Sequence, residues 1–108
     1  MPKLTDLFAA LGDPVRFAIT ERLLRDGAQS AGDLRDVAEI SAPAISRHLK
    51  VLRSAGVISQ TIDKQRRIYA VNPASVGSIR AWIDSHEAFW ASSLDRLATA
   101  LQEDKPDE

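Results

Sequence analysis

Apolar side chains recur every three or four residues through the first part of the chain, which is the spacing of one face of an α-helix. A stretch of this kind over residues 4–11 predicts a first helix. A second helix is predicted to begin at Asp13, a helix-capping residue followed by a proline, and to end at the next glycine. Ser30 and Asp33 have the spacing of a capping box, so a short third helix is expected over residues 31–38.

The most regular amphipathic pattern covers residues 41–56. Ser41 is a favourable N-cap, and Gly56 suits the left-handed residue that often follows a helix. One face is apolar, and the other carries hydroxyls and cations without an acid. The residues of that polar face are Ser46, Arg47, Lys50, Arg53 and Ser54. A helix with one face in the core and such an opposite face fits the major groove of duplex DNA, although a solvated basic face is the simpler alternative.

Two β-rich runs follow, over residues 57–62 and 67–71, on either side of a short polar link. They predict a β-hairpin whose tip carries Lys64, Arg66 and Arg67. A helix-turn-helix followed directly by a basic hairpin is a winged helix. The predicted fold class is therefore α+β, mostly α: a winged helix-turn-helix with a two-stranded β-hairpin wing and a long C-terminal dimerisation helix.

After Asn72, an apolar stripe about six turns long contains both tryptophans and predicts one last helix that reaches Leu101. A domain this small cannot bury so much apolar surface against itself, and exposed patches of this kind usually mark association surfaces. We therefore predict a dimer interface between the first and last helices of two copies. Its residues are Leu4, Leu7, Phe8, Leu11, Trp82, Phe89, Trp90, Leu94, Leu97 and Leu101. In the alternative, both tryptophans and Phe89 fold back into the core of their own chain.

The chain length of 108 residues predicts one domain over residues 1–103, followed by a disordered tail at 104–108. The formal net charge is −1, but residues 41–72 hold six cations against Asp63 alone, a net charge of +5. A net positive charge is thus confined to the predicted helix and hairpin. Cysteine is absent, and so are a membrane-spanning run and a signal-peptide pattern, so we expect a cytoplasmic protein without membrane association.

Four parts of the sequence carry a likeness to a known family: residues 11–16, the helix at 41–56, the hairpin return at 66–69, and the tryptophan-bearing last helix. Together they resemble the ArsR-type (ArsR/SmtB-like) winged helix-turn-helix regulators of prokaryotes. The resemblance implies a homodimer that places each 41–56 helix in a major groove of an inverted-repeat operator, with the 62–68 wing on the flanking backbone. Members of this family typically repress transcription, and many release DNA when an effector binds; the effector here stays open.

Side-chain chemistry divides the predicted DNA contacts into two groups. The residues placed for base edges are Ser41, Ala44, Ser46 and Arg47, of which Arg47 suits a guanine. Long flexible cations suit phosphates, and these are Lys50, Arg53, Lys64, Arg66 and Arg67. His48 lies at the edge of the apolar stripe, where it is either a structural hydrogen-bonding residue or a phosphate donor.

The sequence differs from the metal sensors of the family that it resembles. It lacks the cysteines that arsenic, cadmium and lead sensors use. Asp84 and His86 match the first half of the zinc-sensor pattern, but the second half falls on Leu97 and Ala100, which cannot coordinate a metal. We therefore expect neither a metal nor another cofactor. A zinc-responsive repressor that uses Asp84 and His86 is the alternative.

No catalytic motif occurs in the sequence, and the two histidines lie on different predicted helices, so we do not expect an enzyme. A further alternative is a winged-helix module that binds only protein through its last helix. The six cations disfavour this alternative, because the centre of a protein-binding face is usually depleted in charge. The favoured hypothesis is a sequence-specific DNA-binding regulator of transcription that acts as a homodimeric repressor.

Overall fold

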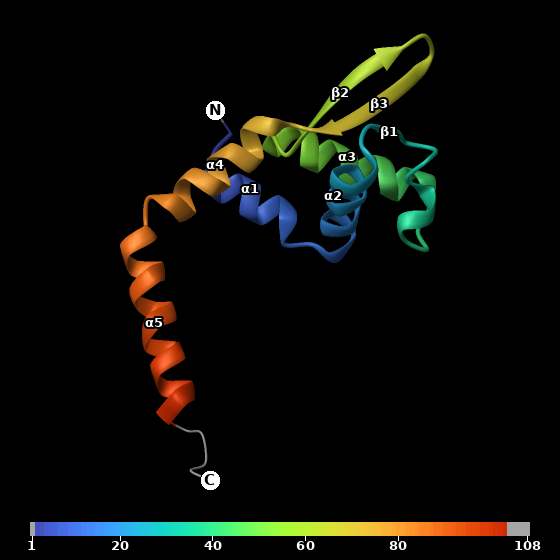
Figure 1. The fold of residues 1–108 in the computed structure, drawn as a ribbon. Coiled ribbons are helices and arrows are strands. Elements are labelled where there is room, and N and C mark those ends of the chain that lie inside the picture. Colours follow the sequence, from blue (N-terminus) through green and yellow to red (C-terminus); the bar gives the residue numbers. More distant parts are fainter. Residues whose placement is uncertain (1, 104–108) are drawn as a thin grey trace.

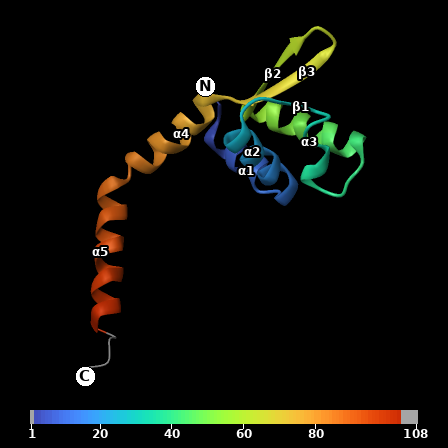
Figure 2. The same cartoon turned by 45° about the vertical axis from the view of Figure 1, so that its right-hand side comes forward.

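The computed structural model describes residues 2–103, and the tail predicted at 104–108 lies outside them. The molecule measures 65 × 33 × 21 Å along its principal axes, because α5 extends away from the other elements (Figures 1 and 2). No helix within residues 2–103 is long and apolar enough to cross a membrane. In chain order the elements are α1 (Leu4–Leu11), α2 (Pro14–Asp26), β1 (Gln29–Ser30), the 3₁₀ turn η1 (Arg35–Val37), α3 (Ala42–Ala55), β2 (Ile58–Asp63), β3 (Arg66–Val71), α4 (Pro73–Asp84) and α5 (Glu87–Glu103).

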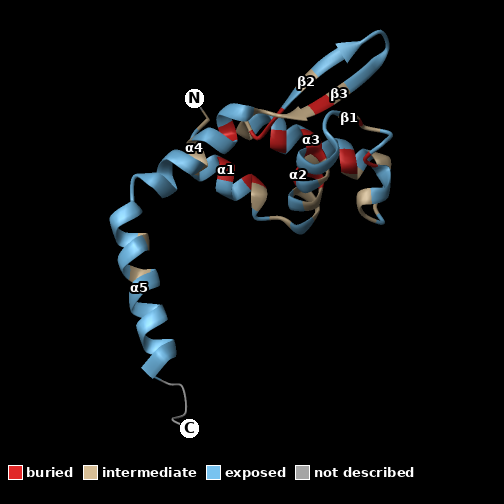
Figure 3. Cartoon of the chain, in the orientation of Figure 1, coloured by how far each residue is buried: buried red, intermediate tan, exposed pale blue. Residues whose placement is uncertain are grey.

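The core lies between α1, α2, α3 and the base of the β2–β3 hairpin. Its largest fully buried side chains are Leu7, Ile19, Leu34, Ile45, Leu49 and Leu52. Half of these belong to one face of α3, so the predicted apolar face of this helix is confirmed. Figure 3 shows buried residues in these elements, whereas α5 has none. The winged helix-turn-helix fold class predicted from the sequence is confirmed by this arrangement.

Local capping determines where α2 and α3 begin and end. The Asp13 carboxylate accepts two backbone N–H groups from the first turn of α2, at 2.9 and 3.0 Å. The Ser41 hydroxyl accepts the backbone N–H of Ala44 at 3.3 Å. Gly56 follows α3 with a φ of 87°, a left-handed conformation that glycine adopts without strain. Both helices therefore begin and end within one or two residues of the predicted positions.

The β2–β3 hairpin forms as predicted, but a third strand joins its base. The strand order is β1-β3-β2, and both pairings are antiparallel. Gln29 and Ser30 of β1 lie opposite Tyr69 and Ile68 of β3. The predicted two-stranded wing is therefore confirmed, and β1, which was not predicted, adds a third strand to the sheet. A strand of two residues shows no alternation of apolar and polar positions, so its sequence carries no signal.

The short helix predicted at 31–38 does not form as an α-helix. The reciprocal capping hydrogen bonds are present: Asp33 Oδ2 accepts the Ser30 N–H at 3.0 Å, and Ser30 Oγ accepts the Asp33 N–H at 3.2 Å. The following turns are closed by bonds between residues three apart, such as Leu34 N–H to Ala31 O at 3.2 Å, and only η1 is helical. A single fully buried side chain, Leu34, anchors this short segment, which is too little to propagate an α-helix.

The sequence predicts one continuous last helix, but the structure has two, α4 and α5, with a break at Ser85 and His86. Both side chains bind the carbonyl oxygen of Trp82, with Ser85 Oγ donating at 2.8 Å and His86 Nδ1 lying at 2.9 Å. The Trp90 indole N–H donates to the Ile83 carbonyl at 3.0 Å. Side chains thus satisfy the carbonyls that a continuous helix would have bonded, which stabilises the bend.

Candidate nucleic-acid interface

The outer face of α3 carries the polar residues that the sequence assigned to DNA. All five of them are exposed: Ser46, Arg47, Lys50, Arg53 and Ser54. Of the two remaining predicted base contacts, Ser41 is exposed at the N-cap and Ala44 is half-buried in the first turn. Val51 is also exposed, to 42%, although the sequence argument did not select it. Val51 lines a hollow between α3 and α1, so it lies at the edge of this face.

Lys50 and Ser54 of this face also lie beside α1. They border a hollow that is also lined by Asp6, Ala9 and Arg16. Neither Arg47 nor Lys50 forms an ion pair with any residue between 2 and 103. Their charges are therefore not neutralised within the described chain and are available to an anionic partner.

His48 joins α3 to the start of α2. Its Nδ1 lies 3.4 Å from an Arg16 guanidinium nitrogen and 3.8 Å from Asp13 Oδ2. Arg16 also donates from Nε to the Ala10 carbonyl at 2.7 Å, which ties the end of α1 into the same cluster. The His48 side chain is only 23% exposed. Of the two roles left open by the sequence, this geometry favours the structural one.

The wing tip is a two-residue loop, Lys64 and Gln65, closed by the pairing of Asp63 with Arg66. Lys64 has a φ of 60°, a left-handed conformation that is uncommon for a residue with a side chain. Lys64, Arg66 and Arg67 are all exposed, as predicted. Because neighbouring residues of a strand point to opposite faces, Arg66 and Arg67 project to different sides of the wing.

Two of the predicted phosphate contacts have partners inside the chain. Arg53 donates from its guanidinium to the side-chain oxygen of Gln60, which links α3 to β2. Arg66 lies 3.7 Å from Asp33 Oδ2, which links the wing to the turn before η1. In the described residues, Lys64 and Arg67 form no ion pair. The sequence argument missed Gln60 and Asp33, since neither belongs to a cationic motif.

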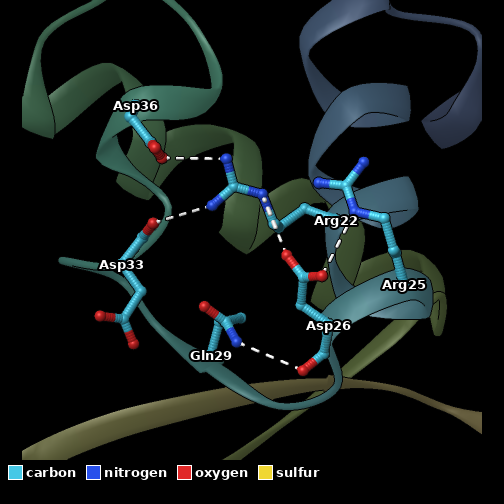
Figure 4. A network of polar contacts seen from close by, with 6 residues as sticks. All are labelled: Arg22, Arg25, Asp26, Gln29, Asp33 and Asp36. Atoms are coloured by element: carbon cyan, nitrogen blue, oxygen red, sulfur yellow. Dashed lines mark hydrogen bonds and ion pairs between the residues drawn. The ribbon is translucent and has the colours of Figure 1, made fainter.

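The turn that carries Asp33 is held against α2 by Arg22 (Figure 4). The Arg22 guanidinium donates to the Asp33 carbonyl at 3.3 Å and lies 3.1 Å from the Asp36 carboxylate. It also lies 3.6 Å from Asp26 Oδ2, so one arginine joins three acidic residues. The Asp33 carboxylate is not among the groups that Arg22 contacts; it accepts the Ser30 N–H and pairs with Arg66 of the wing. Its pKa is lowered by the hydrogen bond from the Ser30 backbone N–H, with a smaller contribution from the Arg66 charge.

The residues predicted for the dimer interface fall into three groups, namely the leucines of α1, an aromatic cluster and a stripe on α5, with Trp90 shared by the last two. Leu7 is completely buried in the core of its own chain, so it belongs to no exposed surface. Leu4 and Leu11 are half-buried. Four aromatic residues form a cluster with ring centroids 4.9 to 6.0 Å apart along the chain of contacts Phe8, Trp82, Trp90 and Phe89.

The third group is a stripe on α5, the α5 seam, which consists of Trp90, Leu94, Leu97 and Leu101 at the spacing of a heptad pattern. Leu94, Leu97 and Leu101 are 65%, 56% and 61% exposed. Trp82 and Phe89 also remain exposed, so the alternative in which the aromatic residues form ordinary core does not describe this structure.

Asp84 and His86, the pair matching half of a zinc pattern, are both engaged in local contacts. Asp84 lies 3.6 Å from Arg80 Nε, and His86 Nδ1 lies at the Trp82 carbonyl. Residues 2–103 contain no group of three or more histidine, cysteine or acidic side chains arranged to hold a metal ion.

Known proteins with similar sequences are regulators of transcription. Residues 11–61 match a family model described as a helix-turn-helix domain. The HTH-type transcriptional regulator Rv2034 of Mycobacterium tuberculosis is 34% identical over 98 residues, which cover 91% of this chain and 88% of that protein. The transcriptional repressor SdpR of Bacillus subtilis is 35% identical over 80 residues, covering 74% of this chain and 88% of the repressor.

A solved structure described as a possible transcriptional regulator for arsenical resistance has a TM-score of 0.69 and 34% identity, covering 88% of this chain and 95% of that one. The structure of an ArsR family transcriptional regulator, RHA00566, has a TM-score of 0.73 and 26% identity, covering 82% of this chain and 96% of that one. These proteins are named for regulation and not for catalysis, in agreement with the absence of catalytic motifs. The chain therefore belongs to the ArsR-type (ArsR/SmtB-like) family of winged helix-turn-helix transcriptional regulators.

Proposed function

We propose that this protein is a homodimeric repressor that binds an inverted-repeat DNA operator. In each subunit α3 enters a major groove, and the wing over residues 62–68 contacts the flanking phosphates. The observation that carries the proposal is the two-sided character of α3, whose apolar face is fully buried and whose cationic face is exposed. The repressor role is supported by the name of the relative from Bacillus subtilis.

The division of contacts follows from the partners that each side chain has. Ser46 and Arg47, with Ser41 and Ala44 at the start of α3, are placed for base edges. Lys50, Lys64 and Arg67 have no ion-pair partner in the described chain and are assigned to phosphates. Arg53 and Arg66 are also assigned to phosphates. On binding DNA, Arg53 exchanges its contact with Gln60, and Arg66 its contact with Asp33, for a phosphate oxygen.

Dimerisation is proposed through the aromatic cluster and the α5 seam. Large exposed apolar side chains along one helix usually mark an interface, and a heptad spacing fits packing against a second helix. A twofold axis between two copies then sets the half-site centres about one helical turn apart, roughly 34–36 Å. An inverted repeat with a different spacing is expected to bind more weakly.

The experiment is a salt titration of binding to DNA taken from upstream of the protein's own gene, followed by footprinting. If about four cations per subunit neutralise phosphates, log K falls against log salt with a slope near −7. A slope shallower than about −3 contradicts the assignment of the basic face. Failure to bind any duplex, together with retained self-association, would instead favour the protein-binding alternative.

A further inference from the structure

A pocket of about 390 Å³ lies between α2 and α4, and of its lining residues only Leu11 was also predicted to lie in the dimer interface. This volume is within the range of sites that hold small molecules, about 300–1,000 Å³. Its walls are mostly apolar and come from both helices. The lining residues used below are Phe17, Thr20, Glu21, Val57, Val76 and Arg80.

The floor of the pocket is joined to the DNA-binding elements by hydrogen bonds. Val57, in the floor, follows the residue that ends α3, and its carbonyl accepts the backbone N–H of Asn72 at 2.9 Å. The same carbonyl accepts the hydroxyl of Ser75, at the start of α4, at 3.3 Å. The Asn72 side chain donates to the Gly56 carbonyl at 3.1 Å. The end of α3, the end of the wing and the start of α4 therefore meet beneath the pocket.

The two polar side chains inside the pocket are already satisfied. Thr20 Oγ1 donates to the Arg16 carbonyl at 2.9 Å, and Ser75 Oγ donates to the Asn72 carbonyl at 2.7 Å. Neither is left to require a polar ligand atom. The interior therefore accepts an apolar molecule without leaving a buried donor unpaired.

Charges at the rim favour a cation. Arg80 lies 3.6 Å from Asp84, so its charge has a partner on the same helix. Glu21 is exposed at the opposite rim and forms no ion pair with a residue between 2 and 103. Of the two charged residues that line the pocket, Arg80 is thus paired with Asp84 outside the lining, and Glu21 is left as the unpaired charge at the rim. Phe17 is half exposed beside Glu21 in the lining and offers an aromatic face, which attracts cations.

We propose that this pocket binds a small lipophilic organic cation, and that its occupancy lowers the affinity of the protein for its operator. The apolar body of the ligand lies between α2 and α4, with the positive charge at Glu21. A ligand wedged there moves α4 relative to α2, and so moves the helices of the proposed interface relative to α3. The second half of this inference depends on the proposed repressor function, whereas the binding itself does not.

The test compares two ions of nearly the same shape and opposite charge, tetraphenylphosphonium and tetraphenylborate, by isothermal titration of the full-length protein without DNA. We expect the phosphonium to bind more tightly, by about tenfold. Glu21→Gln should weaken the phosphonium by about three- to fivefold. Glu87→Gln, which removes an exposed acid outside the pocket, is the matched control and should change nothing. Val76→Trp should block binding by filling the pocket.

Operator binding in the presence of tetraphenylphosphonium then tests the regulatory half. We expect the apparent Kd for DNA to rise in the parent protein and to stay constant in Val76→Trp, which also controls for binding of the ion to DNA itself. Equal affinity for both ions, or phosphonium binding that Val76→Trp leaves intact, overturns the site. A protein that binds phosphonium but no operator disproves the proposed function and leaves the site standing.

Discussion

Arg66 of the wing and Asp33 of the preceding turn form an ion pair, with 3.7 Å between Nη2 and Oδ2. The contact ties a cation assigned to phosphate back onto the body of the same molecule. Asp33 is fixed in this position by hydrogen bonds with Ser30 and by the contact of its carbonyl with Arg22. Under the proposed mode of DNA binding, Arg66 therefore exchanges a carboxylate for a phosphate when the wing meets DNA.

Asp33→Asn should consequently strengthen DNA binding. The amide still accepts the Ser30 N–H but no longer attracts Arg66, so the gain in affinity is expected to be a few-fold and the same for all sequences. Fluorescence anisotropy with operator and with unrelated duplex measures it. Asp36→Asn removes an acid that pairs with Arg22 instead of the wing and serves as the control. Weaker binding by Asp33→Asn than by Asp36→Asn would contradict the proposed exchange.

Arg47→Ala should reduce discrimination at one base position of each half-site. Loss of a bidentate contact to guanine costs about 1–3 kcal/mol on the correct sequence and much less on others. Competition binding against a set of single-base operator variants reports this. Arg96→Ala removes an exposed arginine of α5 and provides the control. An equal loss on every duplex would reassign Arg47 to phosphate.

Lys64→Gly should stabilise the fold while weakening DNA binding. A left-handed residue with a side chain costs about 1–2 kcal/mol, and glycine at the φ of 60° removes that cost. The midpoint of urea denaturation is expected to rise, and the affinity for DNA to fall through the lost charge. The other loop residue, Gln65, has no positive φ, so Gln65→Gly should lower the midpoint. A lower midpoint for Lys64→Gly would refute the interpretation.

Trp90→Ala should shift the proposed dimer toward monomer. The substitution removes part of the aromatic cluster and also the indole N–H bond to Ile83 that holds the bend. DNA binding then weakens because two linked half-site contacts become independent. Sedimentation velocity across a concentration series measures the shift, with Ser92→Ala on the same helix as the control. A Trp90→Ala protein that stays dimeric below micromolar concentration would place the interface elsewhere.

The stability of the fold should depend on the ionisation of Asp13. The backbone N–H of Arg16 lowers the pKa of Asp13 below its ordinary value of 3.8, with the Val15 N–H and the Arg16 and His48 charges acting in the same direction. The stabilisation is therefore complete above this ordinary value and is lost as the pH falls through the lower pKa of the folded state.

The measurement is the free energy of unfolding of the parent and of Asp13→Asn from about pH 7 to about pH 2. Asparagine keeps the cap but does not titrate, so the stability advantage of the parent should shrink only at the acid end. An advantage that stays constant down to the lowest pH would exclude Asp13 as the source.

Features governed by neighbouring residues could be predicted from the sequence. The caps Asp13, Ser41 and Gly56 act within one turn, and the apolar face of α3 repeats at helical spacing, so α2 and α3 were predicted closely. The same holds for the exposed cations of α3 and the wing. Their assignment to bases or phosphates stays a prediction.

Features governed by distant residues could not be predicted. β1 forms because Gln29 pairs with Tyr69 of β3, which lies forty residues later in the sequence. The bend at Ser85 depends on which carbonyls the side chains reach, and helical periodicity on both sides hides it. The contacts Arg53–Gln60 and Arg66–Asp33 likewise depend on how the hairpin lies against the body.

Under the proposed function, the bend at Ser85 and His86 separates the DNA-binding part of the chain from the helix that pairs two subunits. Because α5 extends away from the rest of the chain and has no buried residue, substitutions in α5 do not disturb the packing of the core or the position of α3. Under the proposed pairing, substitutions confined to the α5 seam change which subunits associate, while α3 keeps its operator. Duplicated copies of such a protein within one genome can thereby diverge into regulators that do not mix.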